Sequence, residues 1–371
     1  MGNHLAQVLM DEFADATGVS GNAKPRRYLW TDAFAVCNFL GLYTQTSDNR
    51  YLQYARELVE QVHHVLGRHR DDDPRRGWIS GLSDHDGEEH PTIGGLRIGK
   101  PLNERKPHET PNAHLEWDQD GQYFHYLTKW MHALNCMGRE TGESRYQRWA
   151  VDLAVTTHKA FTREISPGGP KRIAWKLSID RSRPLVSSMG QHDPLDGLIT
   201  FLELQANPGI DAEVRGDLAV AISDFTEMCA NARWATEDPL GIGGLLDNAT
   251  RLSQLIRQNS VSRREFLREL LIEAELSLKI FSRSSLLRRP ANQRLPFREL
   301  GLSIGLHGLE RMSRSSDLDL AAAYDCVLPY KPLAGQIEAF WSDSEHRLGT
   351  TWTDHRDINA VMLATSLMPE A

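Results

Sequence analysis

One segment of this chain occurs twice. It reads TSDNRYLQYAREL at 46–58 and TGESRYQRWAVDL at 141–153. Each copy combines a polar turn, an Arg-Tyr pair, and Ala and Leu at helical spacing, and each follows an aromatic-rich stretch that begins with Trp and Asp. Repeated units of this kind are helical hairpins that bury their apolar faces against their neighbours. The repeat therefore predicts an array of helical hairpins.

Apolar periodicity and turn residues predict about twelve helices. They are expected at Leu5–Thr17, Trp30–Thr44, Arg50–Leu66, Asp120–Arg139, Arg145–Phe161, Pro194–Gln205, Ala212–Ala232, Gly243–Gln258, Ser262–Phe281, Phe297–Ser313, Asp317–Leu328 and Asp357–Leu367. The first and last helices have no neighbour in sequence, so pairing them gives six hairpins and closes a ring. We expect an all-α fold, an (α/α)6 toroid, formed by residues 1–371 as one domain.

Two stretches interrupt the hairpins, at about 68–116 and 162–191. Loops of this length inside a compact domain are usually functional or disordered, and the second has room for a short strand. An open helical-repeat scaffold is the main alternative fold, but it would have short, regular loops. The long loops instead favour a toroid with an elaborated mouth.

The composition limits the partners. A formal net charge of -8 and a pI near 6.0 argue against a nucleic-acid partner. The sequence contains no apolar run long enough to span a bilayer, so we expect no membrane partner. Cys37, Cys136, Cys229 and Cys326 are isolated in expected helices and are interpreted as small buried residues. We therefore expect a cytoplasmic protein with no metal and no cofactor.

Acidic residues and histidines gather where the inner helices are expected to begin. In a closed ring of alternating inner and outer helices, these starts share one mouth. The candidates for acid/base catalysis are Asp32, Asp118, Asp120, Asp193, Asp196, His192 and His355. Helix capping is the alternative explanation for each aspartate, since Asp is favoured at helix N-termini.

Aromatic and polar residues accompany these starts. The indole rings of Trp30, Trp117, Trp175 and Trp352 offer apolar faces on which sugars stack. Further candidates for substrate binding are Gln122 and His125, on a polar stripe that continues to Lys129, with Lys176, and Arg97 and Lys100 in a glycine-rich loop. A satisfied buried network is the alternative for the stripe. The acidic loop 84–90 lacks the spacing of known metal motifs and is interpreted as solvated.

The hairpin array, the Trp-Asp helix starts and the chain length resemble the six-hairpin glycosidase-like superfamily, which includes unsaturated glucuronyl hydrolases and, in related toroids, N-acylglucosamine 2-epimerases. The resemblance to the hydrolases implies acid/base work by mouth carboxylates, for which Asp32, Asp118 or Asp120, and Asp193 or Asp196 are the matching positions. The resemblance to the epimerases implies paired histidines, with His192, His307 and His355 as candidates.

The combined expectation is a carbohydrate-active enzyme, a glycoside hydrolase that acts on a small or oligomeric sugar. Asp118 and Asp193 are the first candidates for its acid and base. A sugar epimerase or isomerase that uses His192 and His355 is the alternative enzyme. A ligand-binding toroid without turnover and a terpenoid cyclase-like enzyme are further alternatives. The sequence defines neither the sugar nor the oligomeric state.

Overall fold

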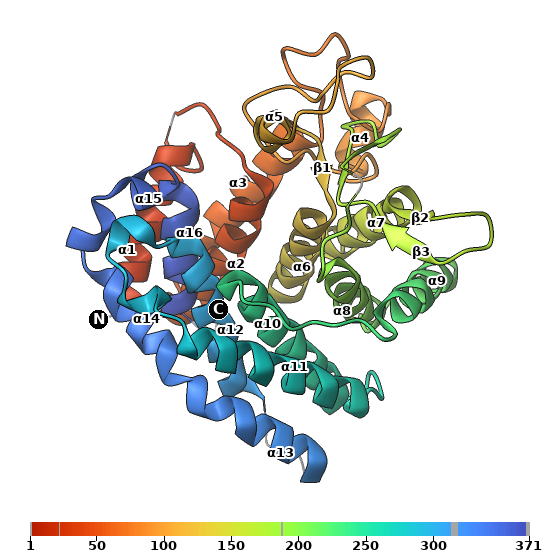
Figure 1. The fold of residues 1–371 in the computed structure, drawn as a ribbon. Helices are drawn as coiled ribbons and strands as arrows, with labels where there is room; N and C mark the ends of the chain where they lie inside the picture. Colours follow the sequence, from red (N-terminus) through yellow and green to blue (C-terminus); the bar gives the residue numbers. More distant parts are fainter. Residues whose placement is uncertain (1, 22, 187, 313–317, 369–371) are drawn as a thin grey trace. The chain divides into compact units, whose positions relative to one another are not determined.

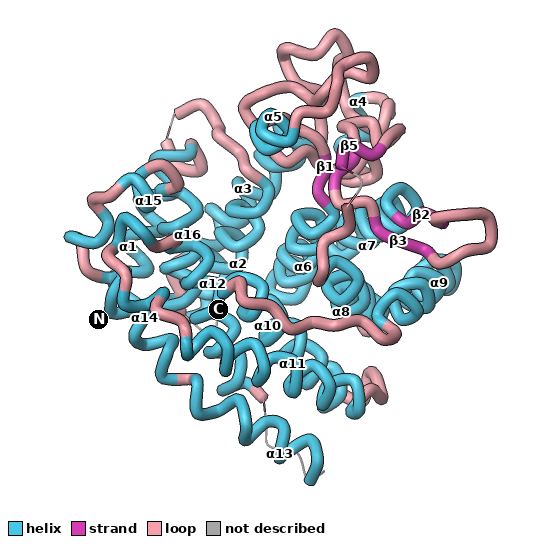
Figure 2. Tube along the Cα trace, in the orientation of Figure 1, coloured by secondary structure: helices cyan, strands magenta, loops and turns pink. Residues whose placement is uncertain are grey.

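The computed structural model describes residues 2–21, 23–186, 188–312 and 318–368. The chain divides into two compact units, residues 14–230 and residues 1–13 with 231–371. Both units are built mainly of helices (Figures 1 and 2). Across the described ranges, no helix combines the length and the apolar character that a membrane crossing requires.

Three helical hairpins form the 14–230 unit. Helices α2, α6 and α8 pack side by side, and each also packs against the helix that follows it in the hairpin, α3, α7 or α9. The helices of this unit are α2 (Leu29–Thr46), α3 (Asn49–Leu66), α4 (Asp84–Glu89), α5 (Ala113–Asp118), α6 (Phe124–Thr141), α7 (Ser144–Phe161), α8 (Asp193–Gln205) and α9 (Ala212–Cys229). The short α4 and α5 lie in the first long loop.

The repeated sequence builds the same turn twice. Thr46 and Thr141 each bond back to a carbonyl one turn earlier and accept a backbone N–H two residues later. The arginine that follows donates to the hydroxyl of the next tyrosine, at 3.1 Å for Arg50 and Tyr51 and at 3.0 Å for Arg145 and Tyr146. Both tyrosine rings are buried. The sequence repeat is therefore a structural repeat at the level of individual hydrogen bonds.

Short strands connect the loops of this unit. They are β1 (Gln122–Tyr123), β2 (Thr162–Glu164), β3 (Lys171–Ile173), β4 (Lys176–Leu177) and β5 (Pro184–Val186). All pairings are antiparallel, in the order β1-β4-β5 in one sheet and β2-β3 in the other, so the strand expected in the second loop is confirmed (Figure 2). The first sheet joins the 162–191 loop to the residues just before α6.

The second unit contains the remaining α-helices. They are α10 (Pro239–Arg257), α11 (Arg264–Arg283), α12 (Pro296–Arg311), α13 (Leu318–Val327), α14 (Pro332–Ser342), α15 (Thr350–Thr353) and α16 (Arg356–Leu367). Helix α1 (Gly2–Thr17) begins in this unit, where Gly2 packs against Leu367 and Glu12 pairs with Arg356 at 3.0 Å. These contacts confirm the expected pairing of the first and last helices and show that the two run antiparallel.

Several predicted helix ends differ from the structure, among them the start of α10, which is Pro239 and not Gly243, and one helix was not predicted. Helix α6 begins at Phe124 and not at Asp120, because the intervening residues pair with β4 and bond to the loops. Helix α9 ends at Cys229, before Asn231 takes a positive φ of 61°. Helix α14 was not predicted, although Ala334, Ile337 and Trp341 follow a helical spacing and are buried. The predicted ends at 313 and 317 lie outside the described residues.

Candidate functional site

Helices α2, α6 and α8 run parallel in the 14–230 unit. The ring of Trp30, in the first turn of α2, lies 5.4 Å from the ring of Tyr126, in the first turn of α6. Further along both helices, Cys37 of α2 lies beside Cys136 of α6. The starts of the three helices therefore lie together, as the toroid interpretation predicts.

A ladder of polar pairs joins α6 to α8. Its rungs are His125 Nδ1 to Asp193 Oδ1 at 3.9 Å, Lys129 Nζ to Asp196 Oδ1 at 3.8 Å, and His132 Nδ1 to Glu203 Oε2 at 3.1 Å. The residues of α6 are spaced by four and three positions, so they share one helix face. At 1.5 Å per residue, the first and last rungs are about 10 Å apart along α6. We call this set the α6–α8 ladder.

Aromatic rings surround the first rung. His125 packs edge-on against Trp30, with ring centroids 6.1 Å apart, and lies nearly parallel to Trp175 at 6.2 Å. The indole N–H of Trp175 donates to His125 Nδ1 at 3.3 Å. Tyr123 stacks on Trp175 at 5.5 Å, and Tyr126 contacts His125 edge-on at 4.8 Å. The first rung is therefore an acid/base pair inside an aromatic wall.

Asp193 is held in a setting that favours its protonated form. Its side chain is 6% exposed, and burial, followed by the neighbouring Asp196 carboxylate, raises the pKa of Asp193 to about 7. The backbone N–H of Gly190 donates to Asp193 Oδ2 at 3.1 Å and partly opposes this rise. A carboxyl group with a pKa near neutrality can donate a proton to a substrate.

His125 shifts in the opposite direction. Its removal from water lowers the pKa of His125 to about 4; the Asp196 carboxylate opposes this shift, and Lys129 reinforces it. The imidazole is therefore neutral at pH 7. Because the Trp175 N–H occupies Nδ1, the ring proton belongs on Nε2.

Asp120 is buried in a cluster of donors. Its Oδ2 accepts from Arg97 at 2.5 Å and from Arg70 at 3.3 Å. Its Oδ1 accepts the backbone N–H groups of Gly99 and Gly121, both at 3.0 Å. These bonds connect the first long loop to the segment before α6. The cluster therefore fixes the backbone of these two segments.

The side chains of Gln122 and Lys176 also form hydrogen bonds with backbone carbonyl groups. The amide of Gln122, which precedes α6, donates to two loop carbonyls at 3.0 and 2.7 Å. Lys176 is fully buried, donates to the carbonyls of Glu116 and Gln119, and pairs with the Glu116 carboxylate at 3.2 Å. Burial lowers the pKa of Lys176. The predicted polar stripe on α6 therefore starts at His125 and runs down the ladder.

The other predicted residues of this unit lie around the aromatic wall. Trp117 is 55% exposed and packs edge-on against Trp175 at 5.6 Å, and Asp118, which follows it, is exposed. Lys100 lies 5.4 Å from the ring of Tyr28, whose hydroxyl is 2.6 Å from that of Tyr126.

Asp32 and His192 stand at the starts of α2 and α8. Asp32 is buried, accepts the backbone N–H of Tyr28 at 2.8 Å and lies 3.6 Å from Arg27. Tyr28 is the N-cap residue of α2 and Asp32 lies within the first turn, so this bond reaches back to the backbone of the N-cap, as the acidic residue of a capping box does. His192 is half-buried and directly precedes Asp193.

Three predicted residues belong to the second unit. His355 is exposed, while Trp352 is buried and stacks on Trp341 at 5.9 Å. His307 is 2.6 Å from the Glu338 carboxylate, within a network that includes Ser303 and Ser366.

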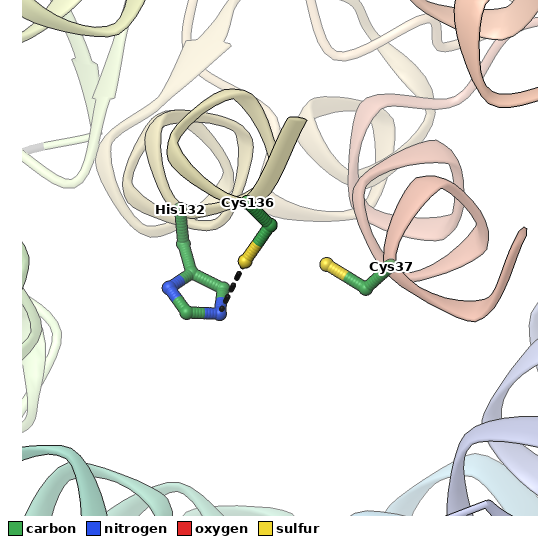
Figure 3. A group of neighbouring side chains, drawn as sticks. All are labelled: Cys37, His132 and Cys136. Atoms are coloured by element: carbon green, nitrogen blue, oxygen red, sulfur yellow. Dashed lines mark hydrogen bonds between the residues drawn. The ribbon is translucent and has the colours of Figure 1, made fainter. Parts of the chain in front are cut away.

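The third rung and the thiols beside it were not predicted from the sequence. Cys37, His132 and Cys136 bring Sγ, imidazole nitrogen and Sγ atoms within 4.8 Å of one another (Figure 3). Cys37 and Cys136 are half-buried and Cys326 is exposed, so the expectation of four buried cysteines was wrong except for Cys229. The one available signal was the spacing of His132 and Cys136, which places them one helical turn apart.

No family model matches the sequence, and a search of curated proteins finds no match either. Solved structures do match. A GH76 α-mannanase from Bacteroides thetaiotaomicron superposes with a TM-score of 0.59 at 9% identity, over 100% of this chain and 96% of that one. An inactive variant of the GH76A α-1,6-mannanase from Salegentibacter sp. HEL1_6, with two consecutive aspartates replaced by asparagine and in complex with α-1,6-mannotriose, gives 0.58 at 13% identity over 99% of both chains.

A cellobiose 2-epimerase from Spirochaeta thermophila also matches, with a TM-score of 0.52 at 12% identity over 98% of this chain and 97% of that one. At these identities the likeness concerns the fold. It confirms the expected all-α fold, an (α/α)6 toroid.

Proposed function

We propose that this protein is a carbohydrate-active enzyme, a glycoside hydrolase in which Asp193 is the general acid. The observation that carries the proposal is the geometry of the first rung: the buried carboxyl group of Asp193 lies 3.9 Å from His125, and the rings of Trp30, Tyr126 and Trp175 pack around that imidazole. Burial also raises the pKa of Asp193 to about 7. Glycosidases need one carboxylic acid that stays protonated near neutral pH and donates to the leaving oxygen. Tryptophan faces such as those of Trp30 and Trp175 suit the apolar faces of sugar rings.

Asp118 is the proposed opposing carboxylate, which would activate water or stabilise the developing positive charge. It is exposed and follows Trp117, whose ring touches Trp175. The related mannanase is inactivated by replacement of two consecutive aspartates. Helices α2, α6 and α8 of this chain begin with LWTD, FHYL and DPLD, and none of these starts contains two consecutive aspartates.

A sugar epimerase is the second candidate. Two observations favour it: the fold is shared with a cellobiose 2-epimerase, and a histidine and a carboxyl group meet at the first rung. In this case His125 or His192 would take part in proton transfer with Asp193. A histidine with a pKa of about 4 is a weak base, which is why hydrolysis ranks first.

The test is a turnover screen with sugars, uronides and aryl glycosides, in which both released reducing sugar and sugar isomers are measured. We expect hydrolysis by the wild type and a loss of about 10²–10⁴-fold in kcat for Asp193→Asn, the usual contribution of a general acid. Asp224→Asn is the matched control, because Asp224 also contacts a histidine, His158 at 2.8 Å, but lies on α9. Full activity of Asp193→Asn would refute the assignment.

The remaining outcomes separate the alternatives. Loss of hydrolysis in Asp118→Asn alone would move the acid role to Asp118. Interconversion without hydrolysis would establish the epimerase, and ligand binding without any turnover would establish a binding protein. The pH profile adds an independent check: since the acid must be protonated, kcat should fall as the pH rises through about 7.

A further inference from the structure

The third rung of the α6–α8 ladder carries a set of metal-type ligands. The Sγ atoms of Cys37 and Cys136 and an imidazole nitrogen of His132 all lie within 4.8 Å of one another (Figure 3). Among the residues that the structure describes, this is the one group of three or more His, Cys, Asp and Glu side chains close enough to share an ion. Two thiols and an imidazole are ligands that zinc prefers.

The distances suit a tetrahedral ion. His132 Nε2 lies 3.6 Å from Cys136 Sγ. A tetrahedral zinc ion with Zn–S near 2.3 Å and Zn–N near 2.0–2.1 Å holds its sulfur and nitrogen ligands roughly 3.6 Å apart. His132 and Cys136 are one turn apart on α6, and Cys37 reaches them from α2, so the set is positioned by two packed helices.

The surrounding groups resemble the outer shell of a metal site. His132 contacts Cys136 through Nε2 and leaves Nδ1 to Glu203, at 3.1 Å. A carboxylate on the far nitrogen of a ligand histidine fixes the ring orientation and increases its basicity. Arg139 donates to Cys136 Sγ at 3.2 Å. With two thiolates, a divalent ion, Glu203 and Arg139, the charges of the site would cancel.

We propose that Cys37, His132 and Cys136 bind a thiophilic divalent metal ion of the Zn²⁺ type. Three protein ligands leave one tetrahedral position for water or another ligand, the arrangement found in catalytic zinc sites. This site is separate from the first rung, and the proposal does not depend on the proposed function. It departs from the sequence-based expectation of no metal.

The experiment is a titration of the reduced full-length protein with Co²⁺, followed by displacement with Zn²⁺. We expect one Co²⁺ per chain, an intense near-ultraviolet band from sulfur-to-cobalt charge transfer, visible bands typical of tetrahedral cobalt, and loss of all bands when Zn²⁺ is added. Reduced wild-type protein that takes up neither ion would overturn the proposal, including the case in which Cys37 and Cys136 only form a disulfide.

Variants test the individual ligands. Glu203→Ala should weaken Zn²⁺ binding by about 10–100-fold, as for other second-sphere partners, and Cys37→Ser, Cys136→Ser and His132→Ala should weaken it more. Cys229→Ser and Cys326→Ser are the matched controls and should bind like the wild type. Circular dichroism establishes that each variant is folded. Unchanged affinity in all three folded ligand variants would also overturn the proposal.

Discussion

Two buried aspartates of the 14–230 unit stand in opposite surroundings. Asp120 accepts hydrogen bonds from two arginines and two backbone N–H groups. Asp193 lies 3.9 Å from His125, with a second carboxylate nearby and one backbone donor at Gly190. The same side chain can therefore serve to hold backbone in one place and to carry an exchangeable proton in the other. The difference lies in the donors that surround each carboxyl group.

The largest effect on stability is expected at Asp120. Asp120→Ala leaves the buried Arg97 guanidinium without its carboxylate, and breaking a buried ion pair in this way costs about 3–5 kcal/mol. Urea denaturation at neutral pH measures the change. Asp72→Ala is the control, since Asp72 also pairs with Arg70 but is 56% exposed, and it should cost less than about 1 kcal/mol. Equal losses in both variants would contradict a special role for Asp120.

Asp193 should show the opposite behaviour. Between its ordinary pKa and about 7, folded Asp193 keeps a proton that the unfolded chain releases, so its contribution to stability falls as the pH rises through this window. The Asp193→Asn variant has no titrating group at this position, so it does not show this loss of stability. Relative to the wild type, its unfolding free energy should therefore improve by roughly 2 kcal/mol between about pH 5 and about pH 7.

His125 tests the direction of this pH dependence, because its pKa is shifted in the direction opposite to that of Asp193. Its folded pKa of about 4 means that the unfolded chain binds the extra proton, so its contribution to stability rises as the pH rises from about 4 to 6.5. His125→Gln should thus change the pH dependence in the direction opposite to Asp193→Asn. Parallel changes in the two variants would show that the first rung does not titrate as described.

The smallest effect concerns Trp175. Trp175→Phe keeps a ring beside His125 but removes the N–H that bonds to Nδ1, worth about 1 kcal/mol. Because this donor favours the neutral imidazole, the pKa of His125 should rise by about 0.7 units, measured by NMR titration. Trp117→Phe, which changes an exposed indole on the other side of Trp175, should leave it unchanged.

Most of the helical architecture could be predicted from the sequence because it depends on local signals. The repeated turns follow from a threonine, a residue that tolerates positive φ and an Arg-Tyr pair, all within one segment. The start of α6 could not be predicted from local signals. It depends on the pairing of Gln122 with β4, which lies far away in the sequence. Asp193 was predicted as a catalytic candidate from its position at a helix start, as was Asp120. Only the three-dimensional structure shows that the two carboxyl groups have different surroundings.

The third rung shows the same limit. The spacing of His132 and Cys136 is visible in the sequence, whereas Cys37 lies in another hairpin and Glu203 in a third. Which side chains gather depends on the rotation of each helix about its axis, and this is set by the packing of the whole inner row. A pattern of isolated cysteines therefore gave no indication of the cluster.

The N–H of Gly190 has a consequence for thermodynamics. Gly190 lies so close to Asp193 that a β-carbon at this position would come within 2.5 Å of the carboxyl group. The proton affinity of the acid thus depends on the position of a loop peptide. A ligand that moves this peptide away from Asp193 raises that affinity, and the complex then takes up a proton from the buffer. The heat of binding would accordingly vary with the ionisation enthalpy of the buffer.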